Sequence, residues 1–218
     1  MALGHSPSIV TSGLVFYVDA ANPRCYPGSG TNLTDNISGI GASLVGGVGF
    51  STFNYGFFTF DGSNDHINFG NSSSVRLLNG TISAWVKTSS PGAGFRGIIA
   101  KQNAWGLFYN DGVLASYDWG ANATRSTGVN IADGNWKNVA MTFQSGITNG
   151  TRIYLNGTSV LTTTITWVND AINLYGGAEF SASQFSNCSG SIFSLYNRPL
   201  SAAEVLQNYN AAKKRYSL

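Results

Sequence analysis

The sequence predicts an all-β protein: a two-sheet antiparallel β-sandwich of the jelly-roll type with a short C-terminal α-helix. Short apolar stretches recur along the chain and are separated by turns rich in Gly, Asn and Ser. Charged residues make up only 10% of the 218 residues, whereas about 25% is usual for a soluble domain. These two observations exclude a helical bundle, a coiled coil and a charged disordered tail.

The N-terminal half of the chain contains a series of expected strands. The first covers residues 13–20 and is followed by a loop over residues 22–30, which contains Pro23 and Pro27. Further strands are expected at residues 56–60, 66–69, 81–87, 97–101, 105–109 and 113–117. Many short strands with turns between them are typical of a β-sandwich or jelly roll.

The strongest local signal lies between residues 136 and 161. Three strands are expected there, at residues 138–143, 151–155 and 159–161. They are separated by the dipeptides Asn149-Gly150 and Asn156-Gly157. Because Asn-Gly tolerates the positive φ angles of two-residue hairpin turns, we expect three antiparallel strands joined by tight turns. A last strand is expected at residues 191–196.

One helix is expected, at the C-terminus. Residues 201–204 form a capping box, in which Ser201 and Glu204 satisfy each other's backbone amides. An apolar stripe follows, made of Val205, Leu206 and Tyr209. The basic residues 213–215 are interpreted as a solvated helix end matched to the helix dipole, with phosphate or envelope binding as the alternative.

No long linker or shift in composition divides the chain, so one domain is expected. Residues 1–12 form an N-terminal arm, residues 13–200 the sandwich, and residues 201–218 a helix that packs on the sandwich or extends from it. No apolar stretch is long enough to span a membrane, and the N-terminus lacks a secretory signal. The net charge of +2 gives no broad electrostatic field, so nucleic acid is not expected as a partner.

Five blocks, in this order, resemble the laminin G-like branch of the concanavalin A-like lectin/glucanase superfamily. They are residues 13–20 (GLVFYVDA), 60–67 (FDGSNDHI), 82–87 (ISAWVK), 133–140 (DGNWKNVA) and 197–204 (NRPLSAAE). The resemblance implies two curved antiparallel sheets packed face to face, often with a structural calcium ion and sometimes with a glycan site. The two ends of the chain look most like versions found in the head-surface and tail proteins of bacteriophages.

Glycoside hydrolases belong to the same superfamily, so an enzymatic function has to be considered. Retaining glycosidases need two carboxyl groups about 5 Å apart, and the superfamily's glucanases carry them on alternate residues of one strand. The chain has only two glutamates, Glu179 and Glu204, and the second is explained as a helix cap. The aspartates nearest to strands, Asp111 and Asp118, flank different turns. We therefore expect the protein not to be an enzyme.

Two turns are candidate calcium sites. Residues 35–39 match a turn of the family that contains Asp35, and residues 61–65 place Asp61 and Asp65 close together. Carboxylate oxygens are the ligands that calcium prefers. The alternative is that these aspartates cap their own turns through the backbone. Calcium is the only cofactor considered, and no other cofactor is expected.

A glycan site is expected where aromatic rings and polar side chains occur together near turns. Sugars pack their apolar faces on such rings, while Asn, Asp and backbone groups bind the hydroxyls. Trp85 and Trp136 are expected in the core. The candidates for glycan contact are Trp105, Tyr109, Tyr117, Trp119 and Trp167, with Asn110, Asp111 and Asp118 nearby.

The two cysteines give two alternatives. In the family the terminal strands lie side by side and antiparallel, which would bring Cys25 and Cys188 close enough for a disulfide. Such a bridge would close a long loop and add up to about 4–5 kcal/mol of stability. The other alternative is two free thiols, which a reducing cytosol favours.

Together these observations lead to a ranked functional hypothesis. The first expectation is a non-catalytic lectin-fold module displayed on a bacteriophage particle, as a head decoration or a tail or fibre surface protein. Its partners would be other virion proteins, host-cell glycans and further copies of the same chain, and it would be assembled in the host cytoplasm. The second is an extracellular carbohydrate-binding adhesin of cellular origin. The third is a glycoside hydrolase or lyase on the same scaffold.

Overall fold

The computed structural model describes residues 7–179 and 184–218. Its elements in the N-terminal half are β1 (Leu14–Asp19), β2 (Asn32–Thr34), β3 (Gly41–Val45), β4 (Gly49–Ser51), η1 (Phe53–Tyr55), β5 (Phe57–Asp61), β6 (His66–Gly70), η2 (Ser73–Val75), β7 (Asn79–Lys87) and β8 (Phe95–Lys101). The second half contains β9 (Trp105–Asn110), β10 (Val113–Asp118), β11 (Ala123–Asn130), β12 (Lys137–Gln144), β13 (Thr151–Leu155), β14 (Thr158–Thr163), β15 (Leu174–Gly176), β16 (Asn187–Tyr196), α1 (Ala202–Ala212) and η3 (Lys213–Tyr216).

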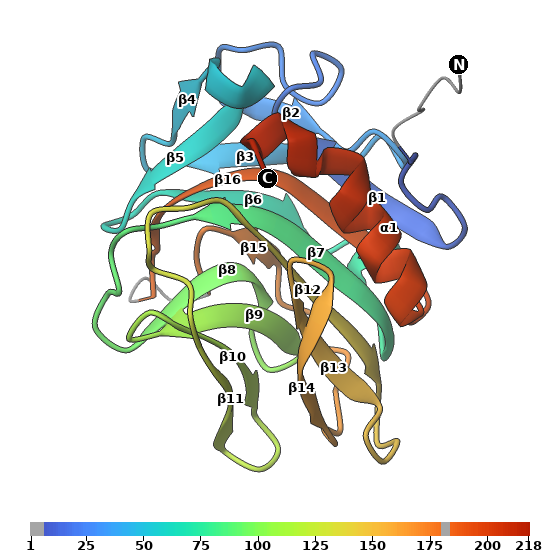
Figure 1. Cartoon of the computed structure of the whole chain (residues 1–218). Coiled ribbons are helices and arrows are strands. Elements are labelled where there is room, and N and C mark those ends of the chain that lie inside the picture. The colour runs from blue at the N-terminus through green and yellow to red at the C-terminus, as the bar shows by residue number, and fades with distance from the viewer. Residues whose placement is uncertain (1–6, 180–183) are drawn as a thin grey trace, which may run out of the picture.

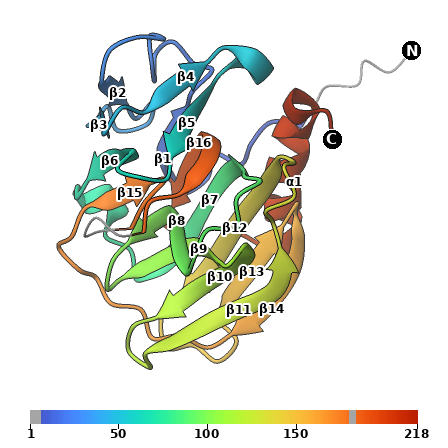
Figure 2. The same cartoon turned by 90° about the vertical axis from the view of Figure 1, so that its left-hand side faces the viewer.

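The strands form two antiparallel sheets of eight strands each. The first sheet has the order β14-β13-β12-β7-β16-β5-β4, and β1 also pairs with β16. The second sheet has the order β11-β10-β9-β8-β15-β6-β3-β2. Figure 2 shows β8 to β11 side by side, below β6 and β15. The expected jelly-roll sandwich with a short C-terminal helix is therefore confirmed.

The core lies between the two sheets and is built from alternate residues of their strands. On β9, Trp105, Leu107 and Tyr109 belong to this core, and on β10 Leu114 does so. Because successive side chains of a strand point to opposite faces, Phe108 on β9 points to the outer face of the second sheet. The outer face therefore also carries a large aromatic side chain.

Helix α1 lies across the outer face of the first sheet (Figure 1). The capping box of Ser201 and Glu204 is present as expected. Val205 packs against Ala140 and Tyr154 on the sheet, and further along the chain Tyr216 stacks on Trp85 at a ring distance of 4.1 Å. The described part of the chain contains no helix that is both long and apolar enough to cross a membrane.

The basic residues after α1 differ from the expected solvated helix end. They form η3, and the side chain of Arg215 is only 11% exposed. Arg215 pairs with Asp19 at 2.7 Å and donates hydrogen bonds to the carbonyl oxygens of Asn54 and Gly56. The expectation was wrong for Arg215, because the chain beyond the helix turns back onto β1 and η1.

The described part of the N-terminal arm is bound to α1. Of the N-terminal arm, residues 1–6 lie outside the described residues, and the backbone nitrogen of Val10 donates a hydrogen bond to Asn208 Oδ1 of α1 at 2.8 Å.

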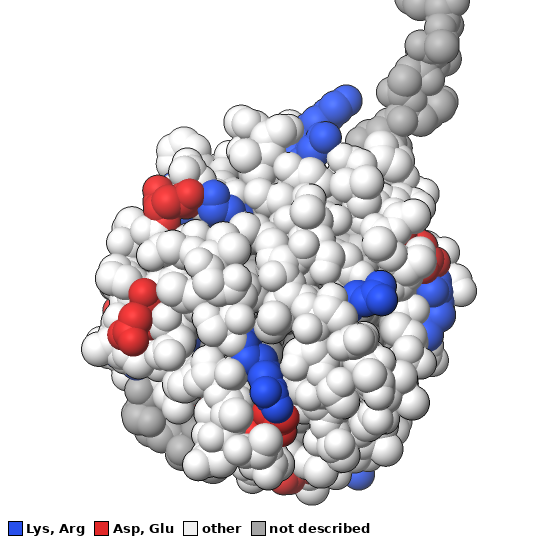
Figure 3. Space-filling model, turned by 60° about the horizontal axis from the view of Figure 1, so that its bottom comes forward, with Lys and Arg blue, Asp and Glu red and all other residues white. Residues whose placement is uncertain are grey.

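Charged side chains are scattered over the face shown in Figure 3. Four opposite-sign pairs occur among the described residues: Asp19–Arg215, Asp118–Arg125, Asp133–Lys137 and Glu204–Arg198.

The three-stranded unit β12-β13-β14 is confirmed, but only one of its turns is as expected. Asn156 and Gly157 both have positive φ, 50° and 79°, and form a two-residue turn between β13 and β14. The loop between β12 and β13 is longer, because Gln144 N donates to Gly150 O and Gly150 N donates to Ile147 O. Asn149-Gly150 is thus the last part of a wider loop, and the expectation of a tight turn there was wrong.

The disulfide between Cys25 and Cys188 is not formed, and both residues are buried free thiols. The terminal strands β1 and β16 do pair in antiparallel fashion, as expected. However, β16 extends beyond β1 at its N-terminal end, where Cys188 is paired with Phe60 of β5. Cys25 lies in a turn that folds back on β1, with its Sγ 3.8 Å from the carbonyl oxygen of Tyr17. Strand β5 therefore occupies the place beside Cys188.

Candidate functional site

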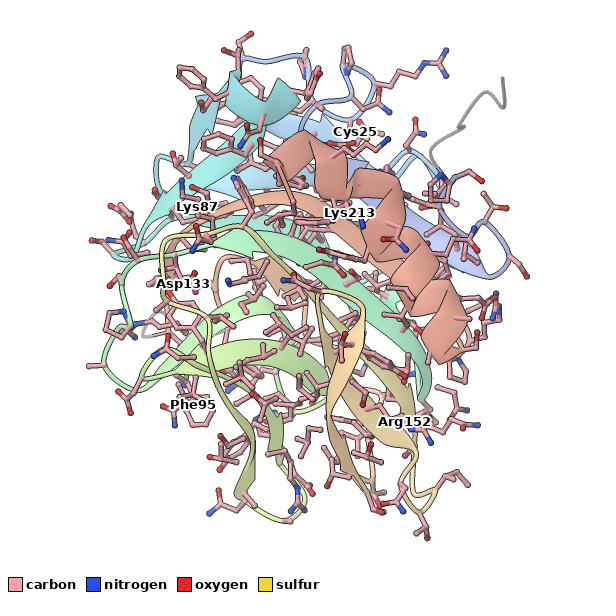
Figure 4. All side chains as sticks on the ribbon, viewed as in Figure 1. Cys25, Lys87, Phe95, Asp133, Arg152 and Lys213 are labelled. Atoms are coloured by element: carbon pink, nitrogen blue, oxygen red, sulfur yellow. The ribbon has the colours of Figure 1, made fainter. Side chains whose placement is uncertain are left out.

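A pocket of about 310 Å³ opens on the outer face of the second sheet, over β8, β9 and β10. This volume is at the lower end of the range of small-molecule sites, about 300–1,000 Å³. Its described lining residues are four aromatic and four polar side chains: Phe95, Phe108, Tyr117, Trp119, Gln102, Asn122, Glu179 and Gln184. Figure 4 shows Phe95 on the part of the molecule remote from α1.

The aromatic part of the pocket is a connected set of four rings. Phe95 meets Tyr117 at a ring distance of 5.4 Å and Phe108 at 5.8 Å. Trp119 meets Tyr117 at 5.5 Å and Phe108 at 6.0 Å. All four contacts are edge-to-face, the arrangement that aromatic pairs prefer. Phe108 is buried whereas the other three rings remain partly exposed, so the set offers a rigid apolar surface to a ligand.

Trp119 is held by the turn between β10 and β11. Asp118, at the end of β10, is buried and pairs with Arg125 of β11 at 2.7 Å. Asn122 has a positive φ of 49°, which Asn tolerates better than most residues. The Asn122 side chain accepts a hydrogen bond from the hydroxyl of Tyr117. These contacts fix the turn and orient Tyr117 beside Trp119.

Glu179 and Gln184 also line the pocket, and the backbone at Ala178 and Glu179 lies close to Gly97 of β8. A Cβ atom at Gly97 would lie 2.2 Å from the carbonyl carbon of Ala178 and 2.5 Å from the backbone nitrogen of Glu179. Gly97 N donates to Gln184 O at 3.0 Å, and Ser186 Oγ donates to Gly97 O at 2.6 Å. The absence of a side chain at position 97 therefore allows this backbone to approach the sheet.

Glu179 and Gln184 each carry a polar group that has no hydrogen-bond partner among the described residues. Gln184 Oε1 is buried and has no hydrogen-bond partner. Glu179 is only 7% exposed, and burial raises the pKa of its carboxyl group from 4.5 to about 7. Burying a polar group without a hydrogen bond costs free energy, about 1–3 kcal/mol in protein mutational data. Both groups are therefore available to a ligand that can form hydrogen bonds with them.

The structure separates the residues expected to bind glycans into two groups. Tyr117 and Trp119 line the pocket. Trp105, Tyr109 and Trp167 are instead fully or almost fully buried in the core, and their expected position near exposed turns was wrong. The indole nitrogens of Trp105 and Trp167 donate to Leu77 O and Thr151 Oγ1, each at 3.0 Å. The strand alternation decides these positions, because it directs Trp105 and Tyr109 inward.

The polar candidates Asn110, Asp111 and Asp118 are not among the described lining residues, but they contact residues next to the pocket. Asp118 forms the ion pair beneath the Trp119 turn, and Asn110 pairs with Phe95 at the end of β9. Asp111 accepts a hydrogen bond from Gly94 N at 2.9 Å. Trp85 and Trp136 are buried as expected, but they lie under η3 on the outer face of the first sheet. Their core is thus a separate one from that between the sheets.

Sequence reasoning missed six of the lining residues: Phe95, Gln102, Phe108, Asn122, Glu179 and Gln184. For Phe108 a signal was present, because it alternates with Leu107 and Tyr109 and so must point to the opposite face. Glu179 was considered only as a member of a catalytic pair. Its position depends on how the backbone after β15 approaches Gly97, and no local pattern indicates that approach.

The candidate calcium ligands accept hydrogen bonds from backbone nitrogens at or near their own turns. Both carboxylate oxygens of Asp35 already accept hydrogen bonds, from the backbone nitrogens of Tyr17, Ile37 and Ser38. Asp61 Oδ1 accepts from Ser63 N at 2.8 Å and Asp65 Oδ2 from Asp61 N at 3.1 Å. Calcium takes six to eight oxygen ligands. Within residues 7–179 and 184–218, no three acidic, His or Cys residues meet at one point. The backbone hydrogen bonds fit the alternative of turn caps, and calcium binding at these aspartates stays a prediction.

The fold and the position of the pocket define the class of protein: a lectin-like jelly-roll domain. The sequence model described as the "Concanavalin A-like lectin/glucanases superfamily", a laminin G-like model, matches residues 61–206. The chain therefore belongs to the concanavalin A-like lectin/glucanase superfamily. No curated protein matches the sequence.

Several solved structures are similar in fold. A sialidase of Trypanosoma rangeli in complex with sialic acid is 16% identical, with a TM-score of 0.74 over 100% of this chain and 36% of that chain. The binding domain of Paraclostridial Mosquitocidal Protein 1 is 15% identical, with a TM-score of 0.68 over 91% of this chain and 52% of that chain. The receptor-binding domain of a botulinum neurotoxin of C/D mosaic serotype is 18% identical, with a TM-score of 0.68 over 90% of this chain and 51% of that chain. The chain thus spans about half the length of these proteins or less, and the similarity is one of fold.

Proposed function

We propose that this chain is a non-catalytic carbohydrate-binding module, and that the pocket beside Trp119 is its saccharide site. The observation that carries the proposal is the combination of partly exposed aromatic rings with unpartnered polar groups in one pocket. Tyr117 and Trp119 supply the rings, and Glu179 and Gln184 supply the polar groups. A sugar ring matches this combination, because its C–H face is apolar and its edge carries hydroxyl groups.

The proposal also draws on the similar structures. One of them is a sialidase bound to sialic acid, and two are binding domains of toxins, one of which is named as receptor-binding. Binding sites are more variable than folds, so these proteins raise the expectation of binding without defining a ligand. The ligand has to be derived from this chain's own pocket.

We propose binding without cleavage because of the carboxyl groups. Most glycoside hydrolases place two carboxyl groups on either side of the scissile bond. Among the described lining residues Glu179 is the one carboxyl group. Glu204 lies at the start of α1, where Arg198 holds its carboxylate with two hydrogen bonds. A hydrolase or lyase on this scaffold would need a second acidic group at the pocket.

Binding is tested by a glycan array followed by calorimetry with the best ligand. Trp119→Ala should abolish binding, or weaken it at least about tenfold, because the ring that stacks on the sugar is lost; tenfold corresponds to about 1.4 kcal/mol. Phe53→Ala is the matched control, since Phe53 is 79% exposed, lies in η1 and does not line the pocket. Undiminished binding by Trp119→Ala, or equal loss in both variants, would contradict the proposed site.

We further propose that the module is displayed on a virus particle, where it is attached to another virion protein. The two chain ends resemble those of bacteriophage head-surface and tail proteins. The surface offers an attachment point at η1, where Phe53 and Tyr55 are 79% and 78% exposed. Exposed aromatic side chains on a rigid loop are typical of binding hot spots. Arg215 makes this loop rigid by binding the carbonyl oxygens on either side of Tyr55.

Virion display is tested by mass spectrometry of purified particles from cultures that produce the protein. We expect the chain in the particles, and expect the double variant Phe53→Ser/Tyr55→Ser to be depleted from them while it remains folded. A chain that is abundant in the lysate but absent from particles would contradict this placement. If the same chain is found on the cell envelope, the cellular adhesin is the correct alternative.

A further inference from the structure

The pocket beside Trp119 has an unusual balance of charge. Among its eight described lining residues there is no Lys, Arg or His, and Glu179 is the one side chain that can carry a charge near neutral pH. The other polar members, Gln102, Asn122 and Gln184, are neutral amides. A ligand in this pocket therefore meets no positive charge from the described walls.

Two hydrogen-bond acceptors of the pocket have no partner among the described residues. Gln184 Oε1 is buried and unpartnered, and the Glu179 carboxyl has no donor among the described residues. The Tyr117 hydroxyl already donates its proton to Asn122 Oδ1. Acceptors of this kind are satisfied by ligand hydroxyl groups, each of which can donate one hydrogen bond. A ligand carboxylate, sulfate or phosphate only accepts hydrogen bonds, so it would leave Gln184 Oε1 and the Glu179 carboxylate without a donor.

From this balance, and resting on the proposed function, we propose that the pocket takes an uncharged saccharide and that Glu179 is the residue that excludes acidic sugars. An acidic sugar would lose part of its hydration on entering the pocket and would gain no cation in return. It would also approach the Glu179 carboxylate, and the juxtaposition of like charges across an interface is unfavourable. Specificity would thus come from a repulsive group as well as from attractive contacts.

The position of Glu179 makes this role possible. The backbone of Ala178 and Glu179 lies close to Gly97 of β8, and Gly97 N donates a hydrogen bond to Gln184 O. The backbone at Glu179 is therefore held close to β8. Burial already disfavours its charged form, and a second negative charge nearby would increase that cost. The pocket can accommodate an uncharged ligand without this additional cost.

The test compares matched pairs of sugars on the same array and by calorimetry. Each pair consists of a neutral oligosaccharide, such as lactose, and its counterpart that carries one sialic or glucuronic acid. For the unaltered protein at pH 8 we expect the neutral member to bind at least about tenfold more tightly, as a like-charge contact of more than 1.4 kcal/mol requires.

Two substitutions of Glu179 distinguish the effect of its charge on acidic sugars from the effect of its size. Glu179→Gln keeps the size of the side chain and removes the charge, so the preference for the neutral sugar should shrink at least about threefold. Glu179→Arg should reverse the preference, because it supplies a bidentate partner for a carboxylate. Gln102→Glu is the matched control for added charge on the same pocket, and it should increase the preference.

The outcomes distinguish the inference from the proposed function. If acidic sugars bind as tightly as neutral ones, and Trp119→Ala abolishes both, the saccharide site is correct and the exclusion by Glu179 is contradicted. An unchanged preference in Glu179→Gln would also contradict it. If no sugar of either kind binds, or if binding persists in Trp119→Ala, the proposed function fails and the inference fails with it.

Discussion

Trp105 and Trp119 carry the same indole ring in two different environments. Trp105 is on an inward position of β9, has no exposed surface, and donates its indole proton to Leu77 O. Trp119 is in the turn after β10, is partly exposed, and lines the pocket. The same side chain therefore supports the fold at one position and is available to a ligand at the other.

Because of this difference, substitution by alanine should mainly reduce stability at position 105 and mainly reduce ligand binding at position 119. Trp105→Ala should lower the free energy of unfolding by about 3–5 kcal/mol, because it leaves a large cavity between the sheets. Trp119→Ala should cost less than about 1.5 kcal/mol and act mainly on binding. Urea denaturation followed by circular dichroism measures both values. Equal destabilisation would show that Trp119 is part of the core and would argue against the site.

Glu179 predicts a pH dependence of stability. Its pKa is about 7 in the folded protein and close to 4.5 in the unfolded chain, so between these values the folded state binds more protons. The free energy of unfolding should therefore fall as pH rises from 4.5 through 7, and this contribution should be constant above that range. In Glu179→Gln the fall should be smaller. Urea titrations at pH 5 and pH 8 measure the free energy of unfolding of both proteins. If it changes by the same amount between the two pH values in the unaltered protein and in Glu179→Gln, the raised pKa of Glu179 is contradicted.

At the scale of elements, the sequence predicted those turns and helix ends that are determined by a few adjacent residues. The turn at Asn156-Gly157 and the capping box of Ser201 were predictable because a few adjacent residues determine each of them. Strand β11 was missed because its residues alternate between exposed and half-buried polar or small side chains. The basic end of α1 was misinterpreted because the partners of Arg215 come from β1 and η1, which are remote in sequence.

The binding of η3 to β1 and η1 predicts a role for Arg215 in stability. Its side chain and that of Asp19 are 11% and 17% exposed, so Arg215→Ala would leave a largely buried carboxylate without its partner. We expect a loss of about 3 kcal/mol in the free energy of unfolding. Lys214→Ala is the matched control, because Lys214 is exposed and forms no ion pair among the described residues. Equal stability of the two variants would show that the Arg215 contacts contribute nothing.

At the scale of the whole molecule, the sandwich closes without a covalent link between its terminal strands. Strand β16 pairs with β7 on one side, and with β5 and then β1 on the other. The family resemblance predicted the neighbouring strands correctly, but it could not predict that β5 would separate Cys188 from the segment after β1. The pocket was also predictable only in part. Tyr117 and Trp119 could be identified as candidates from the sequence, but Glu179 and Gln184 are remote in sequence from them, and no local pattern places them in the same pocket.

The free thiols predict a simple result for the intact protein. Alkylation under denaturing conditions without a reductant should modify two cysteines, and prior reduction should leave the number unchanged. In the folded protein both thiols should react slowly, since both are buried and burial raises the pKa of Cys188 to about 12. Mass spectrometry measures both quantities. A gain of two reactive thiols only after reduction would show that a bridge forms.

The most direct test of the saccharide site is an NMR titration that observes the indole N–H signals of the five tryptophans. With a neutral oligosaccharide chosen from the array, we expect a saturable shift of the Trp119 signal, while the signals of the buried Trp105 and Trp167 stay nearly unchanged. A saturable shift of other indole signals with Trp119 unaffected, or no shift at any concentration of a sugar that the array reports as bound, would contradict it.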